Sequence, residues 1–175
     1  MRFNFPVIII DEDFRSENAS GLGIRALAKA IEVEGFEVIG VTSYGDLSSF
    51  AQQQSRASAF ILSIDDEEFS GDEAEKTIAE LRAFVQEIRC RNENIPIFLH
   101  GETRTSRHIP NDVLRELHGF IHMNEDTPEF VARYIVREAR TYLESLPPPF
   151  FRALTHYAAD GSYSWHCPGH SGGVA

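Results

Sequence analysis

Short runs of apolar residues alternate along the chain with longer segments in which apolar residues return every three or four positions. The short runs predict buried strands, because continuous apolar runs are typical of strands that are covered on both faces. The longer segments predict amphipathic helices that pack on a parallel sheet. The expected strands are Phe5 to Ile10, Phe36 to Val41, Ala57 to Ile64, Ile95 to His100 and Gly119 to Met123.

Five helices are expected between and after these strands. The first has Ile24, Leu27, Ala28 and Ile31 on one face and should stop at Gly35. The fifth should open with Thr127 as N-cap and Pro128 in the first turn, and should end at Pro147. Its expected buried side carries Val131, Tyr134, Ile135, Tyr142 and Leu146. The other three are predicted at Leu47 to Ala51, Asp72 to Arg91 and Asn111 to Leu117.

The order of these elements predicts a three-layer α/β/α domain with a five-stranded parallel sheet. The expected fold is flavodoxin-like or receiver-like, with strand order 2-1-3-4-5. The run Pro147-Pro148-Pro149 cannot continue a helix and favours a stiff, extended segment. We therefore expect one domain over residues 1–146, a proline-rich linker over 147–153, and an irregular extension over 154–175 that opens another domain.

Composition and charge restrict the classes of partner. Hydrophobic residues make up 42% of the chain and charged residues 25%, which fits a globular protein. The net charge of −11 repels phosphates and anionic membrane surfaces, so we expect neither nucleic acid nor a membrane as partner. Cys90 and Cys167 are the only cysteines, too few for a disulfide scaffold, and no signal peptide precedes Asp11. These features predict a cytoplasmic protein.

Acidic residues follow two of the predicted strands, at the sheet edge where open α/β folds bind ligands. Asp11 and Glu12 follow the first strand, and Asp65 follows the third. This arrangement resembles the acidic pocket in which receiver domains of two-component systems hold magnesium beside a phospho-accepting aspartate. The sequence thus predicts a receiver-like acidic pocket.

Two other receiver residues are missing. A receiver needs a hydroxyl residue after the fourth strand and a lysine after the fifth, but Gly101-Glu102 and Met123-Asn124 stand there. The only lysines, Lys29 and Lys76, lie off the apolar faces of their helices. We therefore favour a pseudo-receiver scaffold and predict no catalytic, cofactor-binding or metal-binding residue. The acids in the first loop also disfavour flavin phosphate, and Ser20-Gly21-Leu22-Gly23 is more typical of a helix start than of a dinucleotide turn.

The last residues form the most specific motif. Aromatic, histidine and glycine residues crowd the segment from Tyr163 to Gly173, which has no helical or strand period. His166, Cys167 and His170 could bind a metal, but a fourth ligand is missing, so a structural loop is favoured over a zinc site.

The segment resembles the Orn/Lys/Arg decarboxylase family of pyridoxal-phosphate enzymes, of the bacterial inducible type. That family enters its catalytic core through a Trp-x-x-Pro-Gly-His-x-Gly-Gly motif, and its Pro-Pro linker is similar to Pro147 to Phe151. The residues that match the motif are Trp165, Pro168, Gly169, His170, Gly172 and Gly173. Tyr163-Ser164-Trp165 is most similar to the biodegradative arginine decarboxylase branch.

The resemblance implies a function for the full-length protein. It would remove the α-carboxylate of a basic amino acid, arginine first and then lysine or ornithine, with pyridoxal phosphate as electron sink. The family's catalytic residues lie beyond position 175, so these 175 residues would be inactive, without cofactor, and would end at the start of the core. The N-terminal "wing" domain would join dimers into a decamer, and its acidic surface implies assembly promoted by acid stress. The alternative is a free-standing pseudo-receiver signalling domain.

Overall fold

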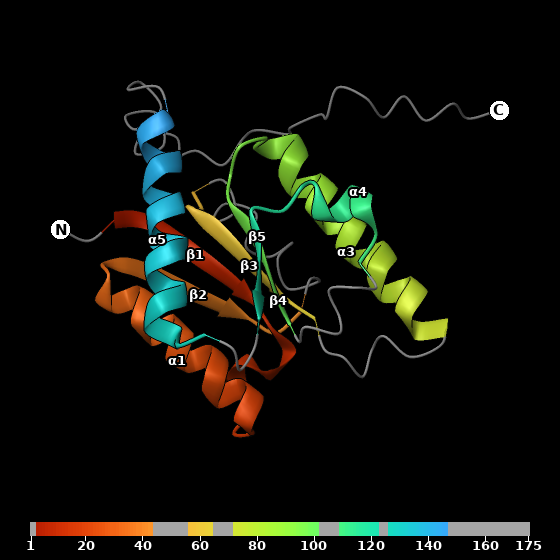
Figure 1. Ribbon diagram of the computed structural model, residues 1–175, viewed down its shortest axis with the longest axis horizontal. Helices are drawn as coiled ribbons and strands as arrows, with labels where there is room; N and C mark the ends of the chain where they lie inside the picture. Colours follow the sequence, from red (N-terminus) through yellow and green to blue (C-terminus); the bar gives the residue numbers. More distant parts are fainter. Residues whose placement is uncertain (1–2, 44–55, 65–71, 102–108, 123–125, 147–175) are drawn as a thin grey trace, which may run out of the picture.

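The computed structural model describes residues 3–43, 56–64, 72–101, 109–122 and 126–146 (Figure 1). A five-stranded sheet lies at its centre, with all neighbouring strands parallel and the order β2-β1-β3-β4-β5. The strands are β1 (Phe3–Ile10), β2 (Phe36–Val41), β3 (Ala59–Ser63), β4 (Ile97–Gly101) and β5 (Gly119–His122). The predicted fold class and strand order are confirmed.

Helices cover both faces of the sheet. They are the 3-10 helix η1 (Glu12–Arg15), α1 (Ala19–Val33), α3 (Asp72–Arg91), α4 (Asn111–Leu114) and α5 (Pro128–Ser145). Figure 1 shows α1 and α5 together on one side of the sheet and α3 with α4 on the other. The helix predicted at Leu47 to Ala51 lies outside the described residues.

Local capping explains where the first and last helices begin. The side chain of Asn18 accepts a hydrogen bond from the backbone N–H of Gly21 at 2.8 Å, so Ser20-Gly21-Leu22-Gly23 does start a helix. Gly35 follows α1 with φ of 96°, which glycine adopts readily. Thr127 caps α5 through the N–H of Phe130 at 3.4 Å. Both predicted starts and the predicted stop after α1 are therefore confirmed.

The fourth helix is shorter than predicted. It ends at Leu114, whereas the apolar pattern continued to Leu117. Arg115 is the C-cap, and the N–H of Leu117 donates to the carbonyl of Leu114 in a turn. Leu117 is nevertheless packed against the core from this turn. The apolar residue at position 117 therefore indicated a side chain that packs on the core, and not a residue within the helix.

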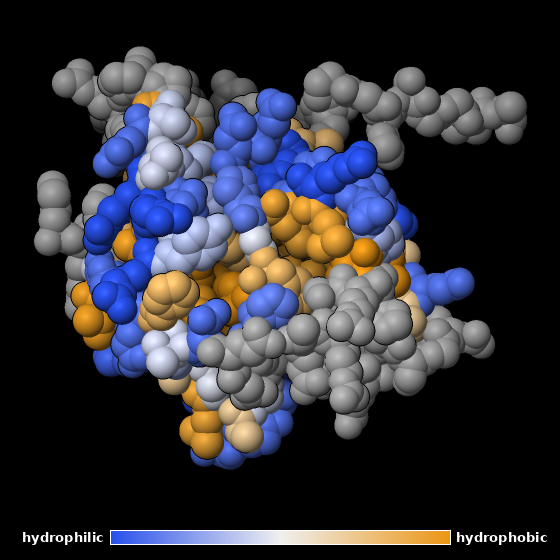
Figure 2. All heavy atoms as spheres, viewed as in Figure 1, coloured by the Kyte–Doolittle hydropathy of each residue, from blue (hydrophilic) through white to orange (hydrophobic). Residues whose placement is uncertain are grey.

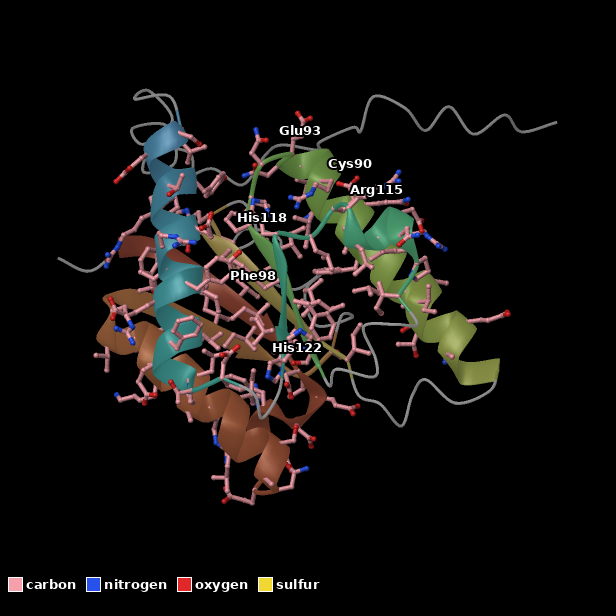
Figure 3. The ribbon with its side chains drawn as sticks, viewed as in Figure 1. Cys90, Glu93, Phe98, Arg115, His118 and His122 are labelled. Atoms are coloured by element: carbon pink, nitrogen blue, oxygen red, sulfur yellow. The ribbon has the colours of Figure 1, made fainter. Side chains whose placement is uncertain are left out.

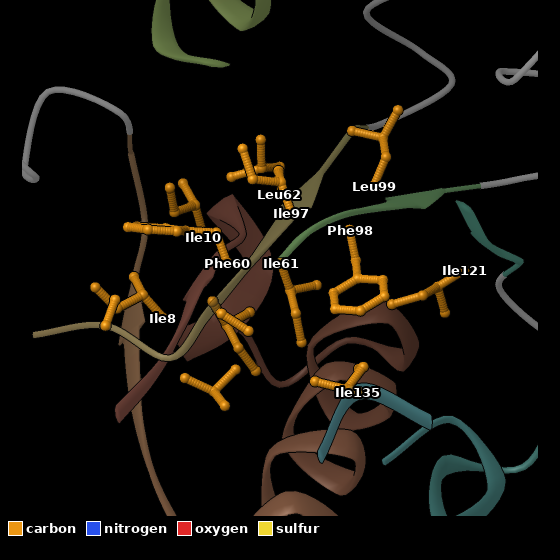
Figure 4. Close-up of a cluster of buried hydrophobic side chains, with 14 of the residues drawn as sticks. Ile8, Ile10, Phe60, Ile61, Leu62, Ile97, Phe98, Leu99, Ile121 and Ile135 are labelled. Carbon is orange, nitrogen blue, oxygen red and sulfur yellow. The ribbon is translucent and has the colours of Figure 1, made fainter. Parts of the chain in front are cut away.

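Two apolar layers hold the sheet between its helices. Phe98 on β4 is fully buried and packs edge-on against Tyr134 of α5, with ring centroids 5.5 Å apart. Figure 4 shows Phe98 near Ile121 and Ile135. On the other face Phe60 meets Phe84 of α3 at 6.2 Å. Successive strand residues point to opposite faces, so each central strand contributes to both layers.

Candidate functional site

The loop after β1 contains the first two residues of the predicted acidic pocket. Asp11 is only 4% exposed, and its carboxylate accepts a hydrogen bond from the backbone N–H of Asp13 at 2.8 Å. This bond makes Asp11 the N-cap of η1. Glu12 is exposed at the start of η1, and Asp65 lies outside the described residues. The three-residue acidic pocket therefore stays a prediction, while a capping role for Asp11 is observed.

The same loop is fastened to α1 by polar contacts. Asn18 donates from its side-chain amide to the Asp13 carboxylate at 2.9 Å. The Arg25 guanidinium donates to the backbone carbonyls of Phe14, at 3.0 Å, and of Ser16. Because Arg25 satisfies two carbonyls that helical bonds do not use, it fixes the path of the chain between η1 and α1.

Two glycines make room for this packed loop. A Cβ atom at Gly21 would lie 2.4 Å from the carbonyl oxygens of Asp13 and Ser16, so only glycine fits there without a shift. A Cβ at Gly40 of β2 would lie 2.0 Å from the Phe14 ring. The aromatic ring thus lies directly on bare β2 backbone. The loop is a close-packed structural unit between β1, β2 and α1.

A buried histidine is the second-to-last residue of β4, next to the position where a receiver has its hydroxyl residue. His100 is 7% exposed, and its Nδ1 lies 3.0 Å from Oγ of Ser63, its register partner on β3. Burial lowers the pKa of His100 to about 4, so the ring is neutral near pH 7. The sequence pattern ended a strand at His100 but did not identify this pair, because only the pairing of β3 with β4 brings the two residues together.

Two further histidines lie at the ends of β5 (Figure 3). His118 precedes the strand, and its pKa is lowered by burial and then by the charge of Arg89. His122 ends the strand, with its ring 4.8 Å from that of Phe120. Receivers have a lysine at the position that Met123-Asn124 occupies in this chain, and these two residues lie outside the described residues. The last described residue of β5 is therefore the histidine at position 122.

Both lysines lie where the helical pattern predicted. The Lys29 side chain is 76% exposed and forms an ion pair with Glu32 at 3.5 Å, and Lys76 is also exposed. Within the described ranges, no three histidine, cysteine or acidic side chains are grouped so that they could hold a metal ion. In that same part of the chain, no helix is long and apolar enough to cross a membrane. The motif from Trp165 to Gly173 lies outside the described residues.

Comparison with known proteins places this fold in a family. The model of the "Orn/Lys/Arg decarboxylase, N-terminal domain" family matches residues 19–142. The chain is 33% identical over 174 residues to lysine decarboxylase LdcA of Pseudomonas aeruginosa, covering 98% of this chain and 23% of the relative. It is 30% identical over 170 residues to the biodegradative arginine decarboxylase of Escherichia coli K12, covering 96% of this chain and 22% of the relative.

Solved structures agree with both the family and the fold class. Lysine decarboxylase A from Pseudomonas aeruginosa superposes with a TM-score of 0.71 at 31% identity, over 97% of this chain and 23% of that one. A response regulator receiver domain from Clostridium thermocellum superposes with a TM-score of 0.57 at 13% identity, over 81% of this chain and 99% of the receiver. The second likeness shows the fold alone.

The match is confined to one end of much longer proteins. The chain spans less than a quarter of the two curated decarboxylases described above. Those proteins act as decarboxylases, whereas the described residues form a receiver-like domain whose first acidic residue caps a helix. The chain belongs to the Orn/Lys/Arg decarboxylase family, of which it carries the N-terminal domain.

Proposed function

We propose that this chain is the assembly domain of a pyridoxal-phosphate-dependent decarboxylase of basic amino acids. The observation that carries the proposal is the family match over residues 19–142, in a chain that spans less than a quarter of its decarboxylase relatives. The proposed division is a wing domain over residues 1–146, a linker over 147–153, and the first residues of a catalytic core over 154–175. The proposed location is the cytoplasm.

The described residues do not fit the cofactor. Pyridoxal phosphate supplies an electron sink and needs a lysine in a water-excluding pocket to hold its aldehyde. Lys29 is ion-paired on the surface of α1, and Lys76 is exposed on α3. We therefore propose that cofactor and substrate bind to another part of the full-length protein. That part corresponds to the segments of the relatives that this chain does not cover. The motif residues Trp165, Pro168, Gly169, His170, Gly172 and Gly173 are proposed to open that part.

The substrate is proposed to be a basic amino acid. The motif residues Tyr163 to Trp165 favour arginine. In contrast, the sequence identity to lysine decarboxylase LdcA, at 33%, is slightly greater than the 30% identity to the arginine enzyme. Arginine therefore stays a prediction that a direct comparison must test. Carbon dioxide release by the full-length protein, loaded with pyridoxal phosphate, should occur with one of arginine, lysine and ornithine. Turnover of none of the three would contradict the proposed activity.

The wing domain is proposed to bind other copies of itself and to join dimers into a decamer. Net charge of −11 opposes this association at neutral pH, and protonation of surface carboxylates lowers the repulsion. We therefore expect the full-length protein to sediment as a larger particle at about pH 5 than at pH 7.5. Added salt should have the same effect at pH 7.5, because it screens like charges. No change in particle size under either condition would count against charge-controlled assembly.

A free-standing pseudo-receiver is the second candidate. It is favoured by the structural likeness that covers 99% of a receiver domain and by the expected pocket of Asp11, Glu12 and Asp65. The downstream reading frame separates the two candidates. Several hundred further codons that encode a lysine segment for the cofactor would support the assembly domain, whereas a reading frame that stops shortly after residue 175 would support the pseudo-receiver.

A further inference from the structure

The outward face of α1 carries a line of side chains opposite the face that packs on the sheet. We call this line the α1 stripe, and it consists of Ala19, Leu22, Ala26, Lys29 and Val33, all exposed. Alternate spacings of three and four residues place them along one side of the helix. Leu22 is 55% exposed and Val33 is 77% exposed. A helix that is apolar on opposite sides is typical of one that is buried on both.

The stripe differs from the exposed side of α5. There the exposed positions are mainly charged and include Arg133, Arg137 and Arg140. Among the described residues, the only other exposed large hydrophobic side chain is Phe130, which is 58% exposed at the start of α5. Figure 2 shows hydrophobic residues at the lower left edge of the molecule, where α1 lies, and a larger hydrophobic area between α5 and α4. Of the three large hydrophobic side chains that are exposed in the described part of the chain, two therefore lie on the outward face of α1.

We propose that the α1 stripe is a contact between two copies of this chain, with their α1 helices packed antiparallel about a two-fold axis. The proposal rests on the self-association proposed above and names the surface that provides it. A two-fold contact requires a surface that is complementary to itself. The α1 stripe meets this requirement because a large apolar residue lies toward each of its ends, Leu22 at one and Val33 at the other.

Charged residues beside the α1 stripe set the register of the two antiparallel α1 helices. When Leu22 faces Val33 of the second copy, Arg25 faces Glu32 of the second copy beside the stripe. Opposite charges then meet on both sides of the axis. Hydrogen bonds to the carbonyls of Phe14 and Ser16 hold the Arg25 side chain in place, so little side-chain entropy is lost on pairing.

Small residues at the centre allow the helices to approach closely. Ala26 lies in the middle of the stripe, where the aliphatic stem of Lys29 of the second copy can cover it. Gly23 lies beside the stripe, and a Cβ there would meet nothing within 4 Å. The helix is roughly 22 Å long, so the pair buries less than the about 800 Å² per partner of a standard interface. We therefore expect a weak contact that adds to others in a larger assembly.

Sedimentation equilibrium of the 175-residue chain, at concentrations up to about 1 mM, tests the contact. We expect wild-type protein to show a concentration-dependent monomer–dimer equilibrium, and Leu22→Glu or Val33→Glu to weaken the dimer at least about tenfold. Phe130→Glu is the matched control, since Phe130 is comparably exposed but lies on α5, and it should associate as wild type does. Circular dichroism confirms that each variant is folded.

Three results would overturn the α1 contact. Wild-type protein that stays monomeric throughout would do so, as would Leu22→Glu protein that associates normally, or loss of the dimer in Phe130→Glu alone. None of them would by itself contradict assembly of the full-length decarboxylase, which the dependence of its particle size on pH tests separately. The two proposals can thus fail independently.

Cross-linking tests the antiparallel register. The variant with both Leu22→Cys and Val33→Cys, made with Cys90 and Cys167 replaced by serine, should form a covalent dimer with a short bis-maleimide. Each single cysteine variant should not, because equivalent residues lie at opposite ends of an antiparallel pair. A covalent dimer from Leu22→Cys alone would mean parallel helices and would overturn the proposed register.

Discussion

Replacing Gly21 with alanine is expected to lower the free energy of unfolding by roughly 1 to 3 kcal/mol, the usual cost of overpacking. The added Cβ would lie 2.4 Å from the backbone oxygens of Asp13 and Ser16. Backbone atoms cannot rotate away as the end of a side chain can, so the whole loop must shift. The shift would also disturb the bonds that Asn18 and Arg25 make to this loop.

Gly23 provides the matched control for this substitution, two residues along the same helix. Its added Cβ meets nothing within 4 Å, and alanine is a better helix former than glycine by about 1 kcal/mol. Gly23→Ala should therefore stabilise the domain while Gly21→Ala destabilises it. Urea unfolding followed by circular dichroism measures both. Equal effects of the two substitutions would show that the loop does not pack on α1 as described.

Acidification from about pH 6.5 to pH 4 is expected to remove about 3 kcal/mol of stability through His100 alone. Burial lowers the pKa of His100 to about 4 in the folded domain, against a usual 6.5. The unfolded chain therefore binds a proton at a higher pH than the folded chain does. This contribution is fully present above pH 6.5 and is lost progressively as the pH falls toward 4.

The variant His100→Asn isolates the effect. Asparagine places a polar atom near the position of Nδ1, within reach of Ser63, but does not titrate. Urea unfolding at pH 7, 6, 5 and 4 should show a shallower loss of stability in the variant than in wild type. The difference in free energy of unfolding between wild type and variant at pH 7 measures the loss of packing separately. Identical pH profiles for the two proteins would contradict a buried, neutral His100.

Acid thus acts on this domain in two opposite ways. Lower pH should reduce repulsion between acidic subunits, while protonation of His100 favours unfolding. The first effect begins wherever exposed carboxylates start to bind protons, and the second becomes complete only near pH 4. Mildly acidic conditions should therefore favour assembly most strongly, before loss of the folded domain offsets the gain.

The central fold could be predicted because its signals are local and repeated. Buried strands need continuous apolar runs, and β2 has the predicted bounds of Phe36–Val41. The third helix likewise has its predicted bounds, Asp72–Arg91, because its apolar stripe is regular. Strand ends were less predictable: β3 and β4 each start two residues later than expected. Ala57 and Ile95 are buried beyond the strand ends, and burial alone does not define a strand.

The candidate site was harder to predict because its contacts join residues that are distant in sequence. The pairing of Ser63 with His100 depends on the register of β3 against β4, which no local pattern specifies. The fit of Phe14 against Gly40 similarly requires the parallel pairing of β1 with β2. The exposed Leu22 and Val33 were visible in the sequence, but the buried face of the same helix gave the stronger signal.

The cap that Asp11 forms has a consequence for how such domains are recognised. An aspartate directly after the first strand can be selected because it stabilises a turn, and its carboxylate here bonds a backbone N–H two residues away. A sequence search that counts acidic residues after the strands would then group non-phosphorylated scaffold domains with receiver domains that are phosphorylated. Distinguishing the two requires asking which N–H groups each carboxylate already satisfies, a question that the order of residues alone cannot answer.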